Sequence, residues 1–122
     1  MGNDHYRSNW EKAAEREKAL NEARRAAALQ AARSAAERLA RDFQVDRIIL
    51  FGSILAEGGF HQYSDIDLAV SGLDAGDYYR AMGVLTMESQ FEIDLKPLDE
   101  LAGLFRRNAE QGMVLYEKRK NC

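Results

Sequence analysis

Two short segments of the chain decide its fold class. Residues 47–53 read RIILFGS, and residues 64–70 read SDIDLAV. The first is a run of β-branched and apolar side chains that ends at Gly52, which is typical of a buried strand. The second is a strand of similar length, and it follows a Gly-rich, polar loop at residues 57–64. The sequence therefore predicts two neighbouring strands, with polar groups gathered where the first ends and the second begins.

The N-terminal third predicts a long helix. Residues 9–42 contain twelve alanines and neither Gly nor Pro, and charged side chains fill most of the other positions. This composition strongly favours one helix, or two helices with a weak break. A helix lined by alanine buries little area but permits close approach to another element. It is either a solvated helix that packs along one stripe or a docking surface for a partner chain.

The remaining elements follow from capping residues and from alternation of apolar and polar side chains. They are a helix capped by Asp74, a strand at residues 91–96 stopped by Pro97, a helix capped by Asp99 that runs to about Gln111, and a closing strand at residues 113–116. The fold class is therefore α/β, an α+β sandwich in which helices pack on a small mixed sheet of about four strands. We expect residues 1–42 to form a helical extension and residues 43–122 to form the domain.

Charge and composition narrow the classes of function. Residues 45–122 carry thirteen Asp and Glu against eight Lys and Arg, so this part offers no broad basic surface for duplex nucleic acid. Its acidity suits a divalent cation, which can bring a nucleotide with it. No apolar run approaches the length of a membrane span, and the polar residues 1–10 do not resemble a signal peptide. With Cys122 as its single cysteine, an incidental thiol, we expect a reduced, cytoplasmic protein.

Two aspartates stand on one strand, where Asp is disfavoured. Asp65 and Asp67 project to the same face because alternate residues of a strand share a face, while Ile66 points to the core. Two such carboxylates repel each other unless a cation lies between them. The alternative is an exposed strand end with two solvated side chains.

Gly52-Ser53 and Asp94 strengthen the metal interpretation. A glycine permits close approach of the backbone to a phosphate, and the Ser53 hydroxyl can donate to it. Asp94 lies on the strand at residues 91–96, on the face opposite to its apolar side chains. If that strand neighbours the strand of Asp65 and Asp67, the three carboxylates form an oxygen-rich site that suits Mg²⁺. Each feature alone has a simpler explanation, a strand-ending turn or a solvated aspartate.

The ordered combination of LFGS, SDIDLAV, EIDL and EQGMVLYE resembles the minimal nucleotidyltransferases of the DNA polymerase beta superfamily. The resemblance implies that Gly52, Ser53 and Ser64 hold the nucleotide. It also implies that Asp65, Asp67 and Asp94 bind two Mg²⁺ ions. The reaction it implies is transfer of a nucleoside monophosphate to a hydroxyl, with Asp94 helping to deprotonate that hydroxyl and pyrophosphate leaving.

Two departures from the family pattern bear on catalysis. Eleven residues separate Ser53 from Asp65, where the family usually has ten. The family also often carries arginines after the Gly-Ser, whereas residues 54–57 read ILAE. Less positive charge beside the phosphates should weaken nucleotide binding.

Similar proteins are antitoxins whose partner is a helical HEPN-domain ribonuclease toxin, which they modify with AMP from ATP. The resemblance therefore implies an enzyme of this kind that acts on a partner protein. The alternative is a binding module that neutralises the toxin by contact alone. The three aspartates favour the enzyme, and the missing arginines favour the contact inhibitor. Transfer to a small molecule such as an aminoglycoside is less consistent with the lack of a substrate domain, and a homo-oligomer stays open.

Overall fold

The computed structural model describes residues 2–119, with side chains for residues 9–119. Its helices and strands follow the predicted order. They are α1 (Gly2–Asp42), β1 (Arg47–Phe51), β2 (Ile66–Ser71), α2 (Asp77–Glu88), β3 (Ile93–Pro97), α3 (Gly103–Glu110) and β4 (Met113–Glu117). Single turns of 3-10 helix, η1 (Ser53–Leu55) and η2 (Leu98–Glu100), follow β1 and β3.

The four strands form one mixed sheet, as predicted, and their order in it is β3-β2-β1-β4. β1 runs antiparallel to both β2 and β4, whereas β2 and β3 are parallel. A parallel pair needs a crossover, and α2 supplies it between β2 and β3. Consequently the C-terminal end of β1 meets the N-terminal halves of β2 and β3 at one edge of the sheet.

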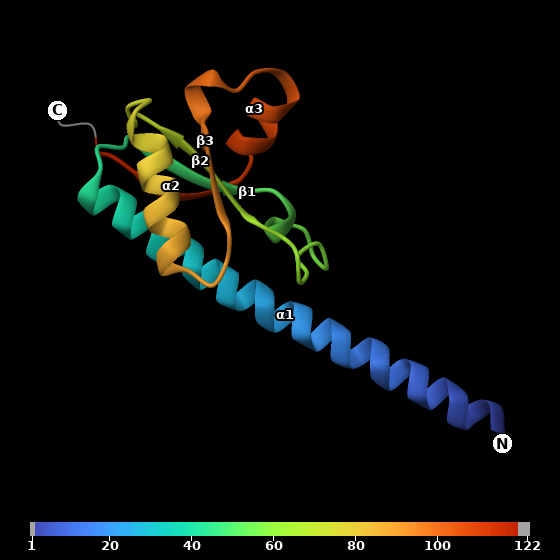
Figure 1. Cartoon of the computed structure of the whole chain (residues 1–122). Helices are drawn as coiled ribbons and strands as arrows, with labels where there is room; N and C mark the ends of the chain where they lie inside the picture. Colours follow the sequence, from blue (N-terminus) through green and yellow to red (C-terminus); the bar gives the residue numbers. More distant parts are fainter. Residues whose placement is uncertain (1, 120–122) are drawn as a thin grey trace.

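The two faces of the sheet are covered unequally. One face carries the larger core, in which Ile48, Leu68 and Val70 are fully buried beneath α1 and α2. The other face carries a smaller cluster in which Ile49 and Ala69 pack against η2 and α3. Figure 1 shows α2 and α3 on opposite sides of the strands. The smaller cluster covers only part of its face, so the rest is available to polar side chains.

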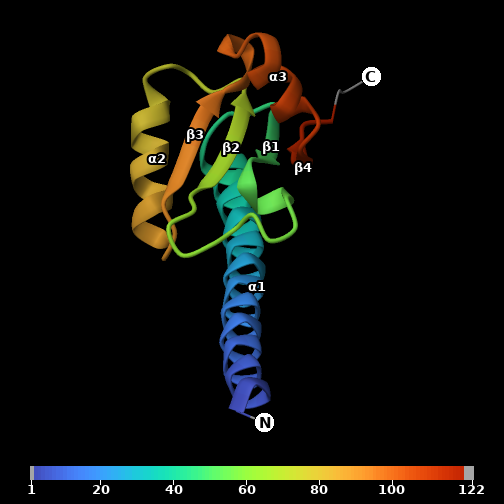
Figure 2. The ribbon, with the colours of Figure 1, turned by 90° about the vertical axis from the view of Figure 1, so that its right-hand side faces the viewer.

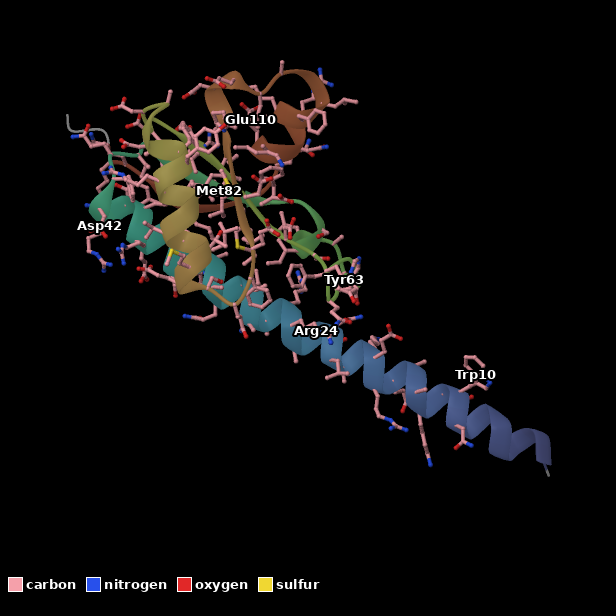
Figure 3. All side chains as sticks on the ribbon, in the orientation of Figure 1. Trp10, Arg24, Asp42, Tyr63, Met82 and Glu110 are labelled. Atoms are coloured by element: carbon pink, nitrogen blue, oxygen red, sulfur yellow. The ribbon has the colours of Figure 1, made fainter. Side chains whose placement is uncertain are left out.

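Helix α1 has two parts with different environments. Ala28, Ala32, Ala35 and Leu39 are buried in the core, and their spacing of three and four residues places them on one stripe. The N-terminal part projects beyond the domain, as Figures 1 and 2 show. Trp10 lies on this part, 76% exposed and away from the sheet (Figure 3). The predicted long helix is thus confirmed. The division of the chain into an extension at residues 1–42 and a domain at residues 43–122 stays a prediction, and the buried stripe of α1 lies within the first of these two parts.

Two predicted helix starts are wrong. α2 begins at Asp77 because the chain first makes a turn in which the Asp77 N–H donates to the Asp74 carbonyl at 2.9 Å. The Asp74 side chain therefore does not cap the helix. α3 begins at Gly103 instead of after Asp99, because Leu98 is buried on the sheet and the chain passes through η2 first. A local turn therefore overrides the capping signal before α2, and packing on the sheet overrides it before α3.

No helix in residues 2–119 is long and apolar enough to cross a membrane. Cys122, which the sequence identifies as an incidental thiol, lies outside the described residues. A cytoplasmic location stays a prediction.

Candidate active site

The site begins where β1 ends. Gly52 has φ 89° and ψ −158°, a conformation that L side chains rarely adopt. A Cβ atom at Gly52 would lie 2.5 Å from Oδ2 of Asp67. Glycine is therefore required both for the backbone turn and for its contact with the carboxylate. Ser53 follows as the first residue of η1 and is exposed to solvent.

Asp67 and Asp94 lie side by side on the neighbouring parallel strands β2 and β3. They are register partners, and Asp67 is also the partner of Phe51 at the end of β1. Register partners on parallel strands lie about 5 Å apart. The Asp67 side chain is 24% exposed and that of Asp94 is 42% exposed. The sequence prediction that these two carboxylates share one sheet face is confirmed.

Asp65 lies outside this pair. It precedes Ile66, the first residue of β2, and its side chain is exposed. Ser64, next to it, closes the loop, since its N–H donates to the His61 carbonyl and its Oγ accepts from the His61 N–H, both at 3.0 Å. Asp65 therefore reaches the site from a loop end and not from a strand. The nucleotide-binding role assigned to Ser64 and the metal-binding role assigned to Asp65 stay predictions.

Lys96 is a part of the site that the sequence did not assign. It follows Asp94 by two residues on β3 and shares its face. Its Nζ lies 3.0 Å from Oδ2 of Asp94 and 3.7 Å from Oδ1 of Asp67. The same ammonium lies 5.8 Å from the centre of the Phe51 ring. The alternation of apolar and polar residues at 91–96 already places Lys96 on the face of Asp94, and this pattern is the sequence signal from which its role could have been predicted.

The electrostatics of the site reflect an excess of negative charge. Partial burial raises the pKa of Asp67; the charge of Lys96 opposes this shift, and the charges of Asp94 and Asp65 add to it. Burial lowers the pKa of Lys96, but its hydrogen bond to Asp94 and the charge of Asp67 outweigh burial and raise that pKa on balance. The lysine therefore offsets only part of the repulsion among three carboxylates. A further cation would be attracted to this face.

The carboxylate oxygens of the site are ligands that suit Mg²⁺, although they do not surround a metal position on all sides. Among the side chains of residues 9–119, no three of His, Cys, Asp or Glu lie close enough together to hold a metal ion. The structure brings Asp67 and Asp94 together and leaves Asp65 at the loop end, so the predicted metal site of three aspartates stays a prediction. Mg²⁺ commonly takes one or two carboxylates and completes its shell with water and substrate phosphates. The pair suits that mode of binding.

Arg25 of α1 fixes the turn beside the site. Its Nε donates to the carbonyl oxygen of Ile54 in η1 at 2.6 Å. A groove of about 710 Å³ lies next to this contact, between α1 and the loop that includes Leu55 and Phe60. The sequence gave no signal for this pairing, because the two residues are 29 positions apart. α1 thus supports the turn after β1 in addition to the core.

The family assignment agrees with this geometry. Residues 34–121 match the model of the polymerase beta nucleotidyltransferase family. The chain belongs to this family. The match includes the Gly52 turn, Asp67 and Asp94, so the site described above lies within the nucleotidyltransferase domain.

Solved structures of similar nucleotidyltransferase folds come from toxin–antitoxin complexes. One, a toxin–antitoxin complex with AMP-PNP, is 27% identical, has a TM-score of 0.59, and the match covers 71% of this chain and 74% of the other. A second, the tri-AMPylated Shewanella oneidensis HEPN toxin in complex with MNT antitoxin, is 26% identical with a TM-score of 0.55, over 73% and 72% of the two chains. These similarities confirm the resemblance to minimal nucleotidyltransferases of the antitoxin type. A comparison with curated proteins finds no significant match.

Proposed function

We propose that this protein is a Mg²⁺-dependent nucleotidyltransferase that transfers AMP from ATP to a hydroxyl group of a partner protein. The observation that carries the proposal is the contact of the Gly52 turn with Asp67, which stands in register with Asp94. A turn that suits phosphate and a carboxylate pair that suits Mg²⁺ thus share one edge of the sheet. Family membership supports the reaction class.

The phosphate side of the site consists of the turn after β1. Gly52 lets the backbone come close to the triphosphate, and the Ser53 hydroxyl donates to a phosphate oxygen. Ser64, at the end of the neighbouring loop, adds a second hydroxyl. Bound Mg²⁺, two ions in this proposal, would neutralise the phosphates and polarise the α-phosphate.

The three aspartates carry the metal-binding and base roles. Asp65 and Asp67 hold Mg²⁺, and Asp94 shares that role while accepting the proton of the attacking hydroxyl. The acceptor oxygen forms a bond to the α-phosphorus, the bond from this phosphorus to the pyrophosphate oxygen breaks, and pyrophosphate leaves. The products are AMP-modified acceptor and pyrophosphate.

The acceptor in this proposal is a helical HEPN-domain toxin, and this chain is its antitoxin. The proposal is supported by the similar solved structures, one of which contains an AMPylated HEPN toxin with an MNT antitoxin. We also propose that residues 1–42 are a helical extension to a transferase domain at residues 43–122. The projecting part of α1 is the candidate docking surface for the partner.

The experiment uses ATP labelled at either the α- or the γ-phosphate, together with a purified HEPN-domain toxin as the partner. Label from α-labelled ATP should appear on the partner, and label from γ-labelled ATP should not. The double variant Asp65→Asn with Asp67→Asn should transfer neither. Transfer of the γ-label would show phosphoryl transfer and contradict the proposal, as would unchanged transfer by the double variant.

A second candidate function is neutralisation by contact alone. It is favoured by residues 54–57, which lack arginine, and by the bond that engages Arg25 with the Ile54 carbonyl instead of a phosphate. In that case the double asparagine variant should still bind the partner and block its toxicity. Loss of protection in the double variant, with partner binding intact, would favour the enzyme.

A further inference from the structure

Lys96 occupies the space that two carboxylates would offer to a metal ion. Asp67 and Asp94 lie side by side on the adjacent strands β2 and β3, and the Lys96 ammonium lies within ion-pair distance of both. The lysine side chain is 36% exposed, so it is not locked in the core. Its flexible four-carbon stem lets the ammonium move without a change in the backbone.

Because both are positively charged, the Lys96 ammonium and a divalent cation compete for the same two carboxylates. A cation bound by both Asp67 and Asp94 needs the lone pairs toward which the Lys96 ammonium points. Two positive charges a few ångströms apart also repel each other, and partial exposure reduces this repulsion without removing it. A free metal ion must therefore displace the lysine from its bond to Asp94.

A nucleoside triphosphate changes this balance. It arrives with several negative charges next to Gly52, where the backbone contacts Asp67. A displaced ammonium can then pair with a phosphate oxygen, and the phosphates supply ligands that the two carboxylates lack. Residues 54–57 contain no arginine, and among the side chains that the structure describes Lys96 is the cation in ion-pair contact with this pair of aspartates.

We propose that Lys96 is an internal counter-ion that weakens binding of free divalent metal at Asp67 and Asp94 and makes metal binding depend on the nucleoside triphosphate. Lys96 is thus a specificity-determining residue, which selects the metal–triphosphate complex over the free metal. This inference rests on the proposed metal-dependent function. It concerns the order in which metal and nucleotide bind and the coupling between the two, neither of which follows from the aspartates alone.

The test is a titration with Mn²⁺, followed by the electron paramagnetic resonance signal of the free ion. The variant Lys96→Met should bind free Mn²⁺ about tenfold more tightly than the wild type, because one nearby positive charge is removed. Lys96→Arg keeps the charge and should stay close to the wild type. Lys12→Met removes an equal charge at an exposed position of α1, two residues after Trp10, which Figure 3 shows on the projecting part of the helix, and should change nothing.

The nucleotide supplies the second readout. Adding the non-hydrolysable analogue AMP-PNP should tighten Mn²⁺ binding to the wild type more than to Lys96→Met, after correction for Mn²⁺ bound by the free nucleotide. Equal or weaker binding of free Mn²⁺ by Lys96→Met would overturn the inference while the proposed function stands. Absence of Mn²⁺ binding in the wild type, with and without the nucleotide, would overturn the proposed function and the inference together.

Discussion

The backbone of Gly52 lies directly against the carboxylate of Asp67, so that a Cβ atom at Gly52 would be 2.5 Å from Oδ2 of Asp67. One glycine thereby joins the turn after β1 to the Asp67 carboxylate on β2, the two parts of the proposed phosphate and metal site. Its φ of 89° adds a second reason for glycine at this position. Any side chain here would disturb both halves of the site at once.

Gly52→Ala should therefore destabilise the protein by about 1–3 kcal/mol and weaken ATP binding, because it combines backbone strain with a steric clash. Urea unfolding and ATP titration would measure the two effects. Gly83→Ala is the matched control, since Gly83 is helical in α2 and an added Cβ would meet no atom within 4 Å. The free energy of unfolding of Gly83→Ala should rise by about 0.5–1 kcal/mol. An unchanged or more stable Gly52→Ala protein would contradict the described turn.

The double variant Asp65→Asn with Asp67→Asn should lose transfer activity by at least about a hundredfold but keep its fold. Burial, opposed by Lys96 and aided by the neighbouring carboxylates, raises the pKa of Asp67, so its charged form is less stable in the folded protein than in the unfolded chain. Removing that charge should not lower the melting temperature of the metal-free protein. Asp74→Asn, on an exposed loop, is the control and should retain activity.

Tyr78 should make stability depend on pH in the alkaline range. Burial, with the charges of Asp99 and Glu100, raises the pKa of Tyr78 to about 12, and its hydroxyl donates to the Val70 carbonyl at 3.1 Å. In the unfolded chain the hydroxyl ionises near its ordinary pKa of about 10, so its stabilising contribution is complete below that pH and is lost as pH rises through the folded-state value.

Tyr78→Phe should cost about 0.5–1.5 kcal/mol at pH 7, the typical loss for one hydrogen bond. The difference in unfolding free energy between the wild type and Tyr78→Phe should shrink between about pH 10 and pH 12. Tyr79→Phe is the neighbouring control, because Tyr79 is 85% exposed. A difference that grows with pH in this window would contradict the assigned role of the hydroxyl.

Arg25→Met should loosen the turn after β1 and weaken ATP binding several-fold, since the Ile54 carbonyl loses its guanidinium donor. The stability cost should be about 1–2 kcal/mol, as for a hydrogen bond to a charged group. Arg24→Met is the control: Arg24, labelled in Figure 3, donates to Asn21 within the same helix. Equal ATP affinities for the two variants would show that α1 does not support the turn.

The parts of the fold that the sequence predicted are those governed by short-range periodicity. The alternation at residues 91–96 placed Asp94 and Lys96 on one face, and the apolar run that ends at Gly52 fixed β1 and its turn. The pairing of Asp67 with Asp94 followed once the two strands were taken as neighbours. The face that each side chain takes depends on residues within a few positions of each other, whereas the pairing of the two strands was a condition that the structure supplies.

The parts that the sequence missed depend on long-range packing. Asp74 and Asp99 carry capping side chains, yet α2 starts only after a turn at Asp74, and α3 starts only after Leu98 has packed on the sheet. The Arg25–Ile54 bond joins distant segments. Asp65 falls outside the carboxylate pair because β2 begins one residue after it. The reach of the Lys96 side chain toward two carboxylates is set by its rotamer, which periodicity does not determine.

The most direct test of the central claim is calorimetric titration of ATP with Mg²⁺ into the wild type and into the double asparagine variant. We expect saturable binding of one ATP per chain in the wild type, lost when Mg²⁺ is chelated and absent in the double variant. Absence of binding to the wild type at millimolar ATP, with Mg²⁺ and the partner protein both present, would contradict a nucleotide site at Gly52, Asp67 and Asp94.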